Sequence, residues 1–161
     1  MRQINFIVLF IFVTIIFGCG DKSRPVDLPP LYPCTITITQ DGKPLAEASV
    51  TLEPADPANV KYKASALTGA DGSVKMKTYG FDGTPIGKYK IVVTKIINEN
   101  IEVKLNESTG KEEATSYQKY RLVEPKFTSA ETTPLEIEVN GKDKKLQKNC
   151  DVGKPIKEAI E

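Results

Sequence analysis

The sequence contains no histidine and no tryptophan, and only three of its 161 residues are cysteine. Without histidine, the Ser-His and Cys-His pairs that activate nucleophiles are excluded, as are metal sites built on imidazole. The chain also lacks a glycine-rich phosphate loop and a paired set of catalytic carboxylates. Asp71 and Asp82 lie in glycine-rich turns and not in the dense Asp-x-Asp spacing of a calcium loop. We therefore predict a protein that is not an enzyme, with no catalytic residues, no metal site and no cofactor.

An excess of either charge is also missing, because 22 basic residues are balanced by 21 acidic ones. Removal of a signal peptide would take away only Arg2 among the charged residues, which leaves 21 of each sign. Proteins that bind the phosphate backbone of nucleic acids carry a basic surplus or a basic stripe. This composition therefore predicts no nucleic-acid partner.

The one long apolar run lies near the start of the chain, over residues 6–17. It follows a short positive region at Arg2 and ends at Gly18-Cys19, which is the pattern of a secretory signal. A helix needs about 20 apolar residues to cross a bilayer, so this run is too short to span one. We predict a signal peptide over residues 1–18. Two interpretations of Cys19 are open: it belongs to a lipoprotein signal, or it is incidental and the signal peptide is an ordinary one.

The last four residues of this segment, Ile16-Phe17-Gly18-Cys19, resemble a lipobox, although that pattern prefers a smaller residue than Phe17. The resemblance implies that Cys19 is lipidated and becomes the new N-terminus. Each buried acyl CH₂ contributes about 0.8 kcal/mol, so the lipid would be an anchor and the membrane a partner. Gly20 in place of Asp indicates the outer membrane or cell surface, and not the inner membrane, by the enterobacterial sorting rule. The expected location is the cell envelope.

Residues 20–33 contain four prolines and few apolar side chains. Such composition favours extended polyproline geometry, at about 3.1 Å per residue. We expect residues 19–33 to consist of the lipidated cysteine and a proline-rich tether of roughly 40 Å.

Apolar and polar residues alternate along most of the remaining chain, which is typical of strands with one buried face. Turn pairs such as Asp41-Gly42 and Asn140-Gly141 separate the strands, and Asn140-Gly141 predicts a hairpin. The expected strands cover residues 34–40, 48–53, 63–68, 73–79, 87–94, 135–139 and 146–152, with a short one at 101–105. Residues 106–116 have the composition of a mobile charged loop, and residues 117–123 are compatible with either a helical turn or an extended segment.

The runs GKPLAEASVTLEPADP and TGADGSVKMKTYGFDGTPIGKYKIVVTK resemble the carboxypeptidase regulatory-like, or transthyretin-like, domain. They are most similar to small lipoproteins of planctomycete-type bacteria, whose pattern often has Gly where this chain has Glu47. The resemblance implies an all-β, seven-stranded Greek-key β-sandwich, prealbumin-like, over residues 34–152. A variable excursion would lie at about 97–120 and a C-terminal tail at 153–161.

An enzyme is not implied by that resemblance. The peptidases that carry such domains bind zinc through a His-x-x-Glu motif, which this chain lacks. The hydroxyisourate hydrolases, a branch of the same fold, have a site that resembles a His/Arg cluster with a C-terminal Tyr-Arg-Gly-Ser. Neither feature is present here.

Cys34 and Cys150 lie in the first and last predicted strands and share the phase of apolar neighbours, so both should face the core. An exported protein occupies a compartment in which disulfides persist. Terminal strands lie side by side in sandwiches of this kind, and similar pilin-type sandwiches carry an isopeptide clamp between them. We therefore predict a Cys34–Cys150 disulfide. The alternative is two buried free thiols.

Two function classes remain open. One is a structural or protein-interaction module of the cell envelope, whose partner would be an envelope protein. The other is a lipoprotein that binds a carbohydrate or peptide through its loops, with Tyr62, Tyr79 and Phe81 as the stacking surface. Edge packing is the alternative role for these aromatic residues.

Overall fold

The computed structural model describes residues 24–143 and 145–160, and nearly all of its regular structure is β. The strands are β1 (Cys34–Gln40), β2 (Lys43–Pro44), β3 (Ser49–Pro54), β4 (Ala64–Leu67), β5 (Ser73–Lys75), β6 (Lys77–Thr78), β7 (Phe81–Asp82), β8 (Gly87–Thr94), β9 (Ile96–Asn106), β10 (Lys111–Arg121), β11 (Glu136–Val139), β12 (Leu146–Asp151) and β13 (Glu158–Ile160). Two short 3₁₀ turns, η2 (Pro57–Tyr62) and η3 (Pro125–Phe127), complete the described elements.

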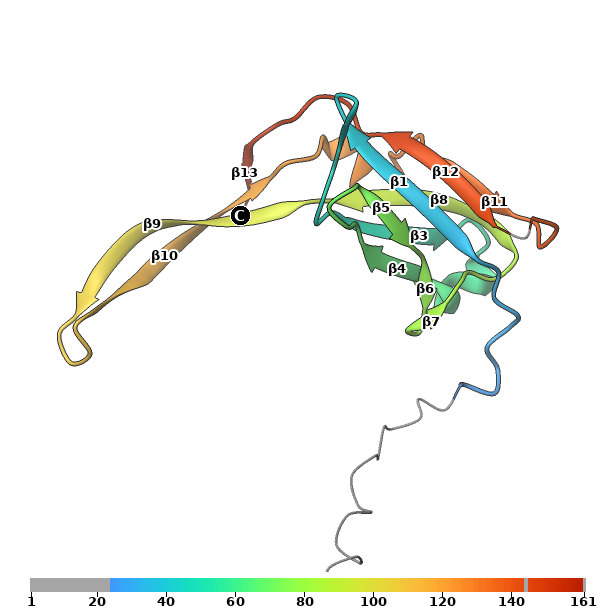
Figure 1. Ribbon diagram of the computed structural model, residues 1–161, viewed down its shortest axis with the longest axis horizontal. Helices are drawn as coiled ribbons and strands as arrows, with labels where there is room; N and C mark the ends of the chain where they lie inside the picture. The colour runs from blue at the N-terminus through green and yellow to red at the C-terminus, as the bar shows by residue number, and fades with distance from the viewer. Residues whose placement is uncertain (1–23, 144, 161) are drawn as a thin grey trace, which may run out of the picture.

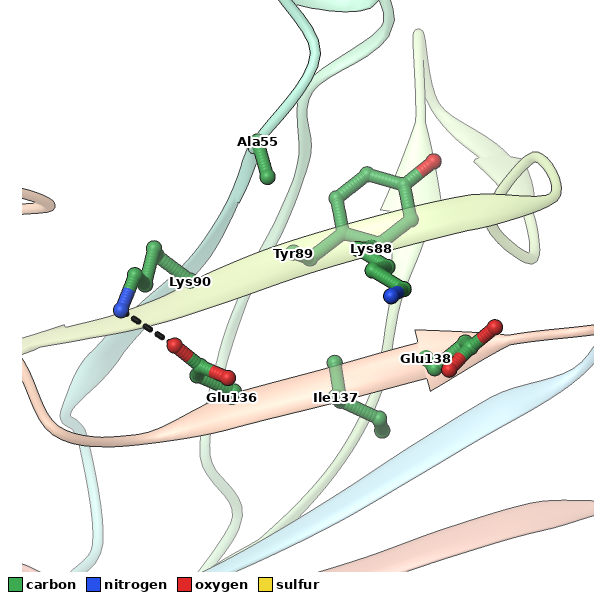
Figure 2. Close-up of a pocket in the computed structure, with 7 residues that line it drawn as sticks. All are labelled: Ala55, Lys88, Tyr89, Lys90, Glu136, Ile137 and Glu138. Carbon is green, nitrogen blue, oxygen red and sulfur yellow. Dashed lines mark hydrogen bonds and ion pairs between the residues drawn. The ribbon is translucent and has the colours of Figure 1, made fainter.

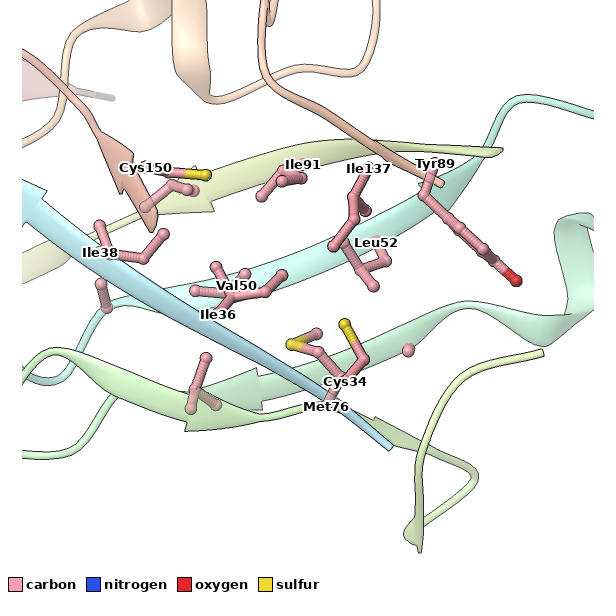
Figure 3. Packing of buried hydrophobic residues seen from close by; sticks show 14 of the residues in the cluster. Cys34, Ile36, Ile38, Val50, Leu52, Met76, Tyr89, Ile91, Ile137 and Cys150 are labelled. Atoms are coloured by element: carbon pink, nitrogen blue, oxygen red, sulfur yellow. The ribbon is translucent and has the colours of Figure 1, made fainter. Parts of the chain in front are cut away.

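Two sheets face each other across a common core (Figure 1). The smaller has the order β12-β1-β2, with β5 also pairing with β1, and the larger has the order β11-β8-β3-β4-β6-β7. Figure 3 shows Ile36 and Ile38 of β1 packed against Val50 of β3 and Ile91 of β8, all fully buried. The predicted all-β sandwich is confirmed.

The core strands form because one face of each is apolar throughout. Along β1, Cys34, Ile36 and Ile38 are buried, whereas the threonines between them are partly exposed. The same alternation runs along β8. Each fully buried aliphatic side chain contributes about 1.5–3 kcal/mol, and a one-residue slip would turn the whole set to solvent.

Residues 73–78 cross from one sheet to the other. The predicted alternation is present, because Val74, Met76 and Thr78 are all buried. However, β5 pairs with β1 whereas β6 pairs with β4, so the predicted single strand is two short ones. Both sheets enclose the same core, so the inward phase continues across the change of sheet.

The last core strand does not return along its predecessor, as a hairpin at Asn140-Gly141 would require. β11 pairs with β8 in the larger sheet, whereas β12 pairs in parallel with β1 in the smaller sheet. The hairpin prediction for Asn140-Gly141 is therefore wrong, since this turn carries the chain between the sheets. The first and last core strands nevertheless lie side by side, as predicted.

The predicted excursion is a long β-hairpin. β8 ends at Thr94 and β9 begins at Ile96, so the hairpin continues β8 out of the sandwich (Figure 1). Its two strands pair from Ile96–Arg121 out to Asn106–Lys111. The charged segment expected as a loop is therefore mostly strand, and residues 117–121 are extended. The predicted C-terminal tail contributes β13, which pairs with β10 at the base of the hairpin.

The described part of the proline-rich segment, residues 24–33, lies against the sandwich. The Leu28 side chain is buried, and Tyr32 forms an isolated bridge with Thr84. Asp27 forms an ion pair with Lys61 at 2.8 Å, and its carbonyl accepts the Tyr62 hydroxyl at 2.8 Å. The prediction of an extended spacer is wrong from residue 24 onward, because these side chains dock on the domain.

Candidate functional site

Cys34 and Cys150 are both buried and both free. In the parallel β1–β12 register, Cys34 is opposite Leu146, whereas Cys150 is opposite Ile38, four positions further along β1. Four residues of strand correspond to about 13 Å, well beyond the roughly 7 Å that a disulfide can bridge. The predicted disulfide is therefore wrong, although both side chains face the core as expected (Figure 3). The register of the parallel pair, which the alternation does not specify, separates them.

The surroundings of both thiols keep them protonated. Burial raises the pKa of the Cys34 thiol to about 11 and raises the pKa of Cys150 as well. A nucleophilic cysteine needs the opposite environment, in which nearby positive charge or a helix N-terminus lowers the pKa. These two residues act as small apolar side chains of the core.

Cys19, the predicted lipidation site, and the predicted signal peptide lie outside the described residues. Within residues 24–143 and 145–160, no helix is long and apolar enough to cross a membrane.

The predicted aromatic residues lie at the end of the sandwich formed by η2 and the β6–β7 turn. The Tyr79 hydroxyl donates to the Lys61 carbonyl at 2.6 Å, and the Lys61 ammonium lies 4.8 Å from the centre of the Tyr62 ring. Phe81 is partly exposed and pairs with Thr78.

Tyr79 itself occupies a turn with φ of 54° and is 54% exposed, so it faces outward through turn geometry and not through strand phase. The Tyr62 and Tyr79 hydroxyls thus bind the protein's own backbone, which is the behaviour of edge packing.

Two concave regions of the described sandwich lie beside side chains that could do chemistry. The first, about 290 Å³, is a groove over the β8–β11 pair, where Lys90 forms an ion pair with Glu136 (Figure 2). That contact lowers the pKa of Glu136, so the carboxyl is ionised and cannot act as a general acid.

The second, about 460 Å³, lies at the Cys34 end of the core, with Lys75, Met76 and Lys145 among its lining residues. No group of three or more potential metal ligands occurs among the described residues. Cys34 also lines the second region, but its buried thiol has a raised pKa and is not the thiolate that a nucleophilic attack requires.

The hairpin presents a different surface. Val103, Leu105 and Tyr117 are 50%, 63% and 60% exposed, although large apolar side chains are usually buried. None of the described hairpin side chains belongs to the core. Among the described strands, β9 pairs only with β10, so its other edge offers unpaired backbone groups. A long edge strand with exposed apolar residues is a template for another chain.

The opposite edge of the hairpin is less available. At its base, β13 pairs with Lys119–Arg121, and Lys157 bonds Glu99 at 2.7 Å while lying 4.5 Å from the Tyr120 ring. Further out, the register shifts on both sides of the Ser116–Glu102 pair, so Thr115 of β10 and Ile101 of β9 have no partner in the ladder. From Val103 to Asn106 the β9 ladder is regular. We therefore take the outer edge of β9, with Val103 and Leu105, as the candidate functional site.

No protein-family model matches the chain, and no curated protein matches it. Among solved structures, the chain is similar to a 9R-lipoxygenase from Cyanothece PCC8801, with 14% sequence identity and a TM-score of 0.35. That similarity covers 82% of this chain and 18% of the lipoxygenase chain. A likeness this weak says nothing about function.

Only part of this site is predictable from the sequence. The alternation of Ile101, Val103 and Leu105 predicted a short strand, but β10 has no comparable apolar series. A second signal was available in Asn106-Glu107-Ser108-Thr109-Gly110. The Asn106 side chain accepts the Ser108 amide at 3.0 Å, and Gly110 has φ of 65°. Asn and Gly in these roles are typical of a tight turn between two strands.

Proposed function

We propose that the protein is a lipid-anchored module of the cell envelope with a structural or protein-interaction role, and that its hairpin is the binding element. The observation that supports this is the unpaired β9 edge with the exposed side chains Val103 and Leu105. A strand added to such an edge gains main-chain hydrogen bonds, while the alternate side chains supply specificity.

A non-catalytic role fits the chemistry of the chain. Without histidine, a nucleophile would need another base, and the buried thiols have raised pKa values. The carboxylate in the groove of Figure 2 is held by Lys90. The resemblance to the carboxypeptidase regulatory-like lipoproteins supports the same conclusion, since it implies a fold and no activity.

The proposed anchor positions the hairpin. Four residues lie between Cys19 and Arg24, and the five steps along the chain that join the two span at most about 18 Å. Because residues 24–33 dock on the sandwich, a lipid on Cys19 would hold the domain close to the membrane. The hairpin projects from the opposite side of the domain to this N-terminal segment (Figure 1). It would therefore point away from the membrane, toward an envelope partner.

Membrane fractionation tests the anchor. The full-length protein should sediment with membranes, on a density gradient with the outer membrane, whereas Cys19→Ser should become soluble. Equal solubility of the two proteins would contradict lipidation, and inner-membrane sedimentation would contradict the proposed location.

Site-specific photo-crosslinking in living cells tests the hairpin. A photoreactive phenylalanine at Leu105 should give a protein adduct, because this side chain is exposed beside the open edge of β9. The same residue at Thr51, on the outer face of β3, is the matched control and should give none. Adducts from Thr51 but not from Leu105 would refute the proposed site.

The second candidate function, binding of a carbohydrate or peptide, is favoured by one observation. Tyr79 is 54% exposed beside Tyr62, so the two rings lie at one end of the sandwich. Pull-down with peptidoglycan or glycans distinguishes the two functions. Retention that is lost in Tyr79→Ala, together with no adduct at Leu105, would favour the second.

A further inference from the structure

We propose that the partner of β9 is β9 of a second copy of this chain, in an antiparallel pair centred on Val103. This inference rests on the proposed function, because it names the partner of the same hairpin. The product would be a four-stranded sheet with the order β10-β9-β9-β10, in which the two open edges close each other.

The chemistry of β9 is symmetric about Val103. On one side of this residue the chain reads Glu102 and Ile101, and on the other side it reads Lys104 and Leu105. In an antiparallel pair centred on Val103, Glu102 of each copy stands opposite Lys104 of the other, and position 101 stands opposite position 105. Each charged position therefore meets the opposite charge, and each aliphatic position meets an aliphatic one.

The charges select this arrangement over its alternatives. Among the described side chains, neither Glu102 nor Lys104 takes part in an ion pair, and both are exposed. A parallel pair in register would place Glu102 against Glu102 and Lys104 against Lys104, and directly opposed like charges are destabilising. On the other strand of the hairpin, Glu113 lies opposite Lys104. In the new sheet, Lys104 would stand between Glu113 of its own hairpin and Glu102 of the second copy, and that row would end at Ser116 of the second copy.

The exposed apolar residues supply the driving force. Val103 is 50% exposed and Leu105 is 63% exposed. The β9–β10 register is regular from Val103 out to Asn106, and it shifts on the inner side of Val103, where Ile101 has no partner on β10. Pairing would place Val103 against its own copy at the two-fold axis. Burial of apolar area contributes about 25 cal/mol per Å². Main-chain hydrogen bonds between the two strands would also pair the free N–H and C=O groups of each β9 edge.

The shape of the molecule accommodates the pair. The hairpin extends well beyond the sandwich, so antiparallel pairing puts the two sandwiches at opposite ends of the new sheet (Figure 1). In this register Asn106 of one copy stands opposite Asn100 of the other. The partner's turn at residues 107–110 then lies beside residues 96–99, at the base of the hairpin. β9 is thus long enough for the turn of each hairpin to reach the base of the other.

Charge exchange tests the register in solution. The full chain, purified in detergent micelles, should show a dimer by sedimentation, with a dissociation constant that rises about tenfold in Glu102→Lys or Lys104→Glu. The double variant Glu102→Lys/Lys104→Glu exchanges both charges and should restore the affinity of the wild type. A monomeric wild type, or a double variant weaker than either single one, would overturn the proposal.

Cysteine crosslinking in membranes tests the geometry. Val103→Cys should form a disulfide-linked homodimer, because its Cα atoms would lie about 4.5–5.5 Å apart across the two-fold axis. Ile101→Cys and Leu105→Cys should each crosslink poorly alone and efficiently when expressed together. The wild type is the background control, since Cys34 and Cys150 are buried.

The outcomes separate this inference from the proposed function. If Val103→Cys forms no homodimer while a photoreactive residue at Leu105 captures a different protein, self-pairing is wrong and the interaction role stands. If neither probe gives a product, both are wrong. Equal crosslinking of Ile101→Cys with itself and with Leu105→Cys would reject the Val103-centred register.

Discussion

Glu47 occupies a backbone conformation that glycine adopts more readily, with φ of 54°. Its amide donates to the Thr68 carbonyl at 3.0 Å, and the next amide, of Ala48, donates to the Thr68 hydroxyl at 2.9 Å. Thr68 is buried, and its hydroxyl in turn donates to the Leu45 carbonyl at 2.6 Å. These bonds hold the turn before β3 in a left-handed conformation whichever residue occupies position 47. Glycine would therefore fit position 47 with less strain than glutamate does.

Glu47→Gly should raise the free energy of unfolding by about 0.5–1 kcal/mol. The left-handed conformation costs a non-glycine residue about 1–2 kcal/mol, and the extra freedom of glycine in the unfolded chain offsets part of the gain. Urea denaturation is the measurement. Glu47→Ala removes the same exposed side chain without relieving the backbone, so it should give no gain. Equal stabilisation by both variants would show that the carboxylate, and not φ, was responsible.

Cys34 should make stability depend on alkaline pH. Burial raises its pKa from 9.0 to about 11, so the folded state favours the neutral thiol. This contribution is complete below about pH 9 and is lost as the pH rises toward 11. The urea midpoint of the wild type should therefore fall more between pH 8 and pH 10.5 than that of Cys34→Ala. Parallel pH profiles would show that the Cys34 thiol is not buried.

At the scale of elements, the Asp71-Gly72 turn packs against the backbone of β1 and β2. A Cβ atom at Gly72 would lie 2.4 Å from the Ile38 carbonyl oxygen, whereas at Gly42 nothing lies within 4 Å. Both glycines have φ of 73°. Alanine at Gly42 therefore measures the cost of the backbone conformation alone, and alanine at Gly72 measures that cost together with the cost of crowding.

Gly72→Ala should destabilise the fold by about 3 kcal/mol or more, and Gly42→Ala by about 1–2 kcal/mol. The second value is the cost of a left-handed alanine alone, and the first adds a clash with backbone that cannot move freely. Thermal unfolding of both variants provides the measurement. A Gly72→Ala variant no less stable than Gly42→Ala would contradict the packing of this turn on β1.

Alternation predicted the core strands because a strand with one buried face must repeat with period two. Val50 and Ile91 could be assigned to the core in this way. The same pattern is silent on which sheet a strand joins, so it did not reveal that residues 73–78 change sheets or that β12 runs parallel to β1. For the hairpin, neither face packs on the core, and residues 111–121 carry no apolar period from which β10 could be predicted. The sequence therefore predicts the short strand at 101–105 but neither its partner β10 nor its open edge, because side chains that pack on no core need no apolar period.

At the scale of the whole molecule, a sandwich with a buried core carries the β9–β10 hairpin, whose described side chains are not part of that core. The sandwich encloses the apolar faces of β1, β3 and β8, and the N-terminal segment docks on it near Thr84. The hairpin leaves from the end of β8, and its described side chains contribute only surface contacts at the base. The proposed binding element and the folded core are therefore different parts of the chain, so we expect that the hairpin can be changed without unfolding the sandwich.

The most direct test removes the hairpin and keeps its base. Glu99 and Gln118 lie opposite each other, so residues 100–117 can be replaced by Asn-Gly, a two-residue hairpin turn. The Lys157–Glu99 ion pair and the β10–β13 pairing both remain. The free energy of unfolding should change by less than about 1 kcal/mol, because no described core residue is removed.

The measurement is the apparent mass of the detergent-solubilised full chain, wild type against this shortened variant. We expect the wild type to migrate as an assembly and the shortened protein, still folded, to migrate as a monomer. An assembly of unchanged mass in the shortened protein would contradict the claim that the hairpin is the binding element.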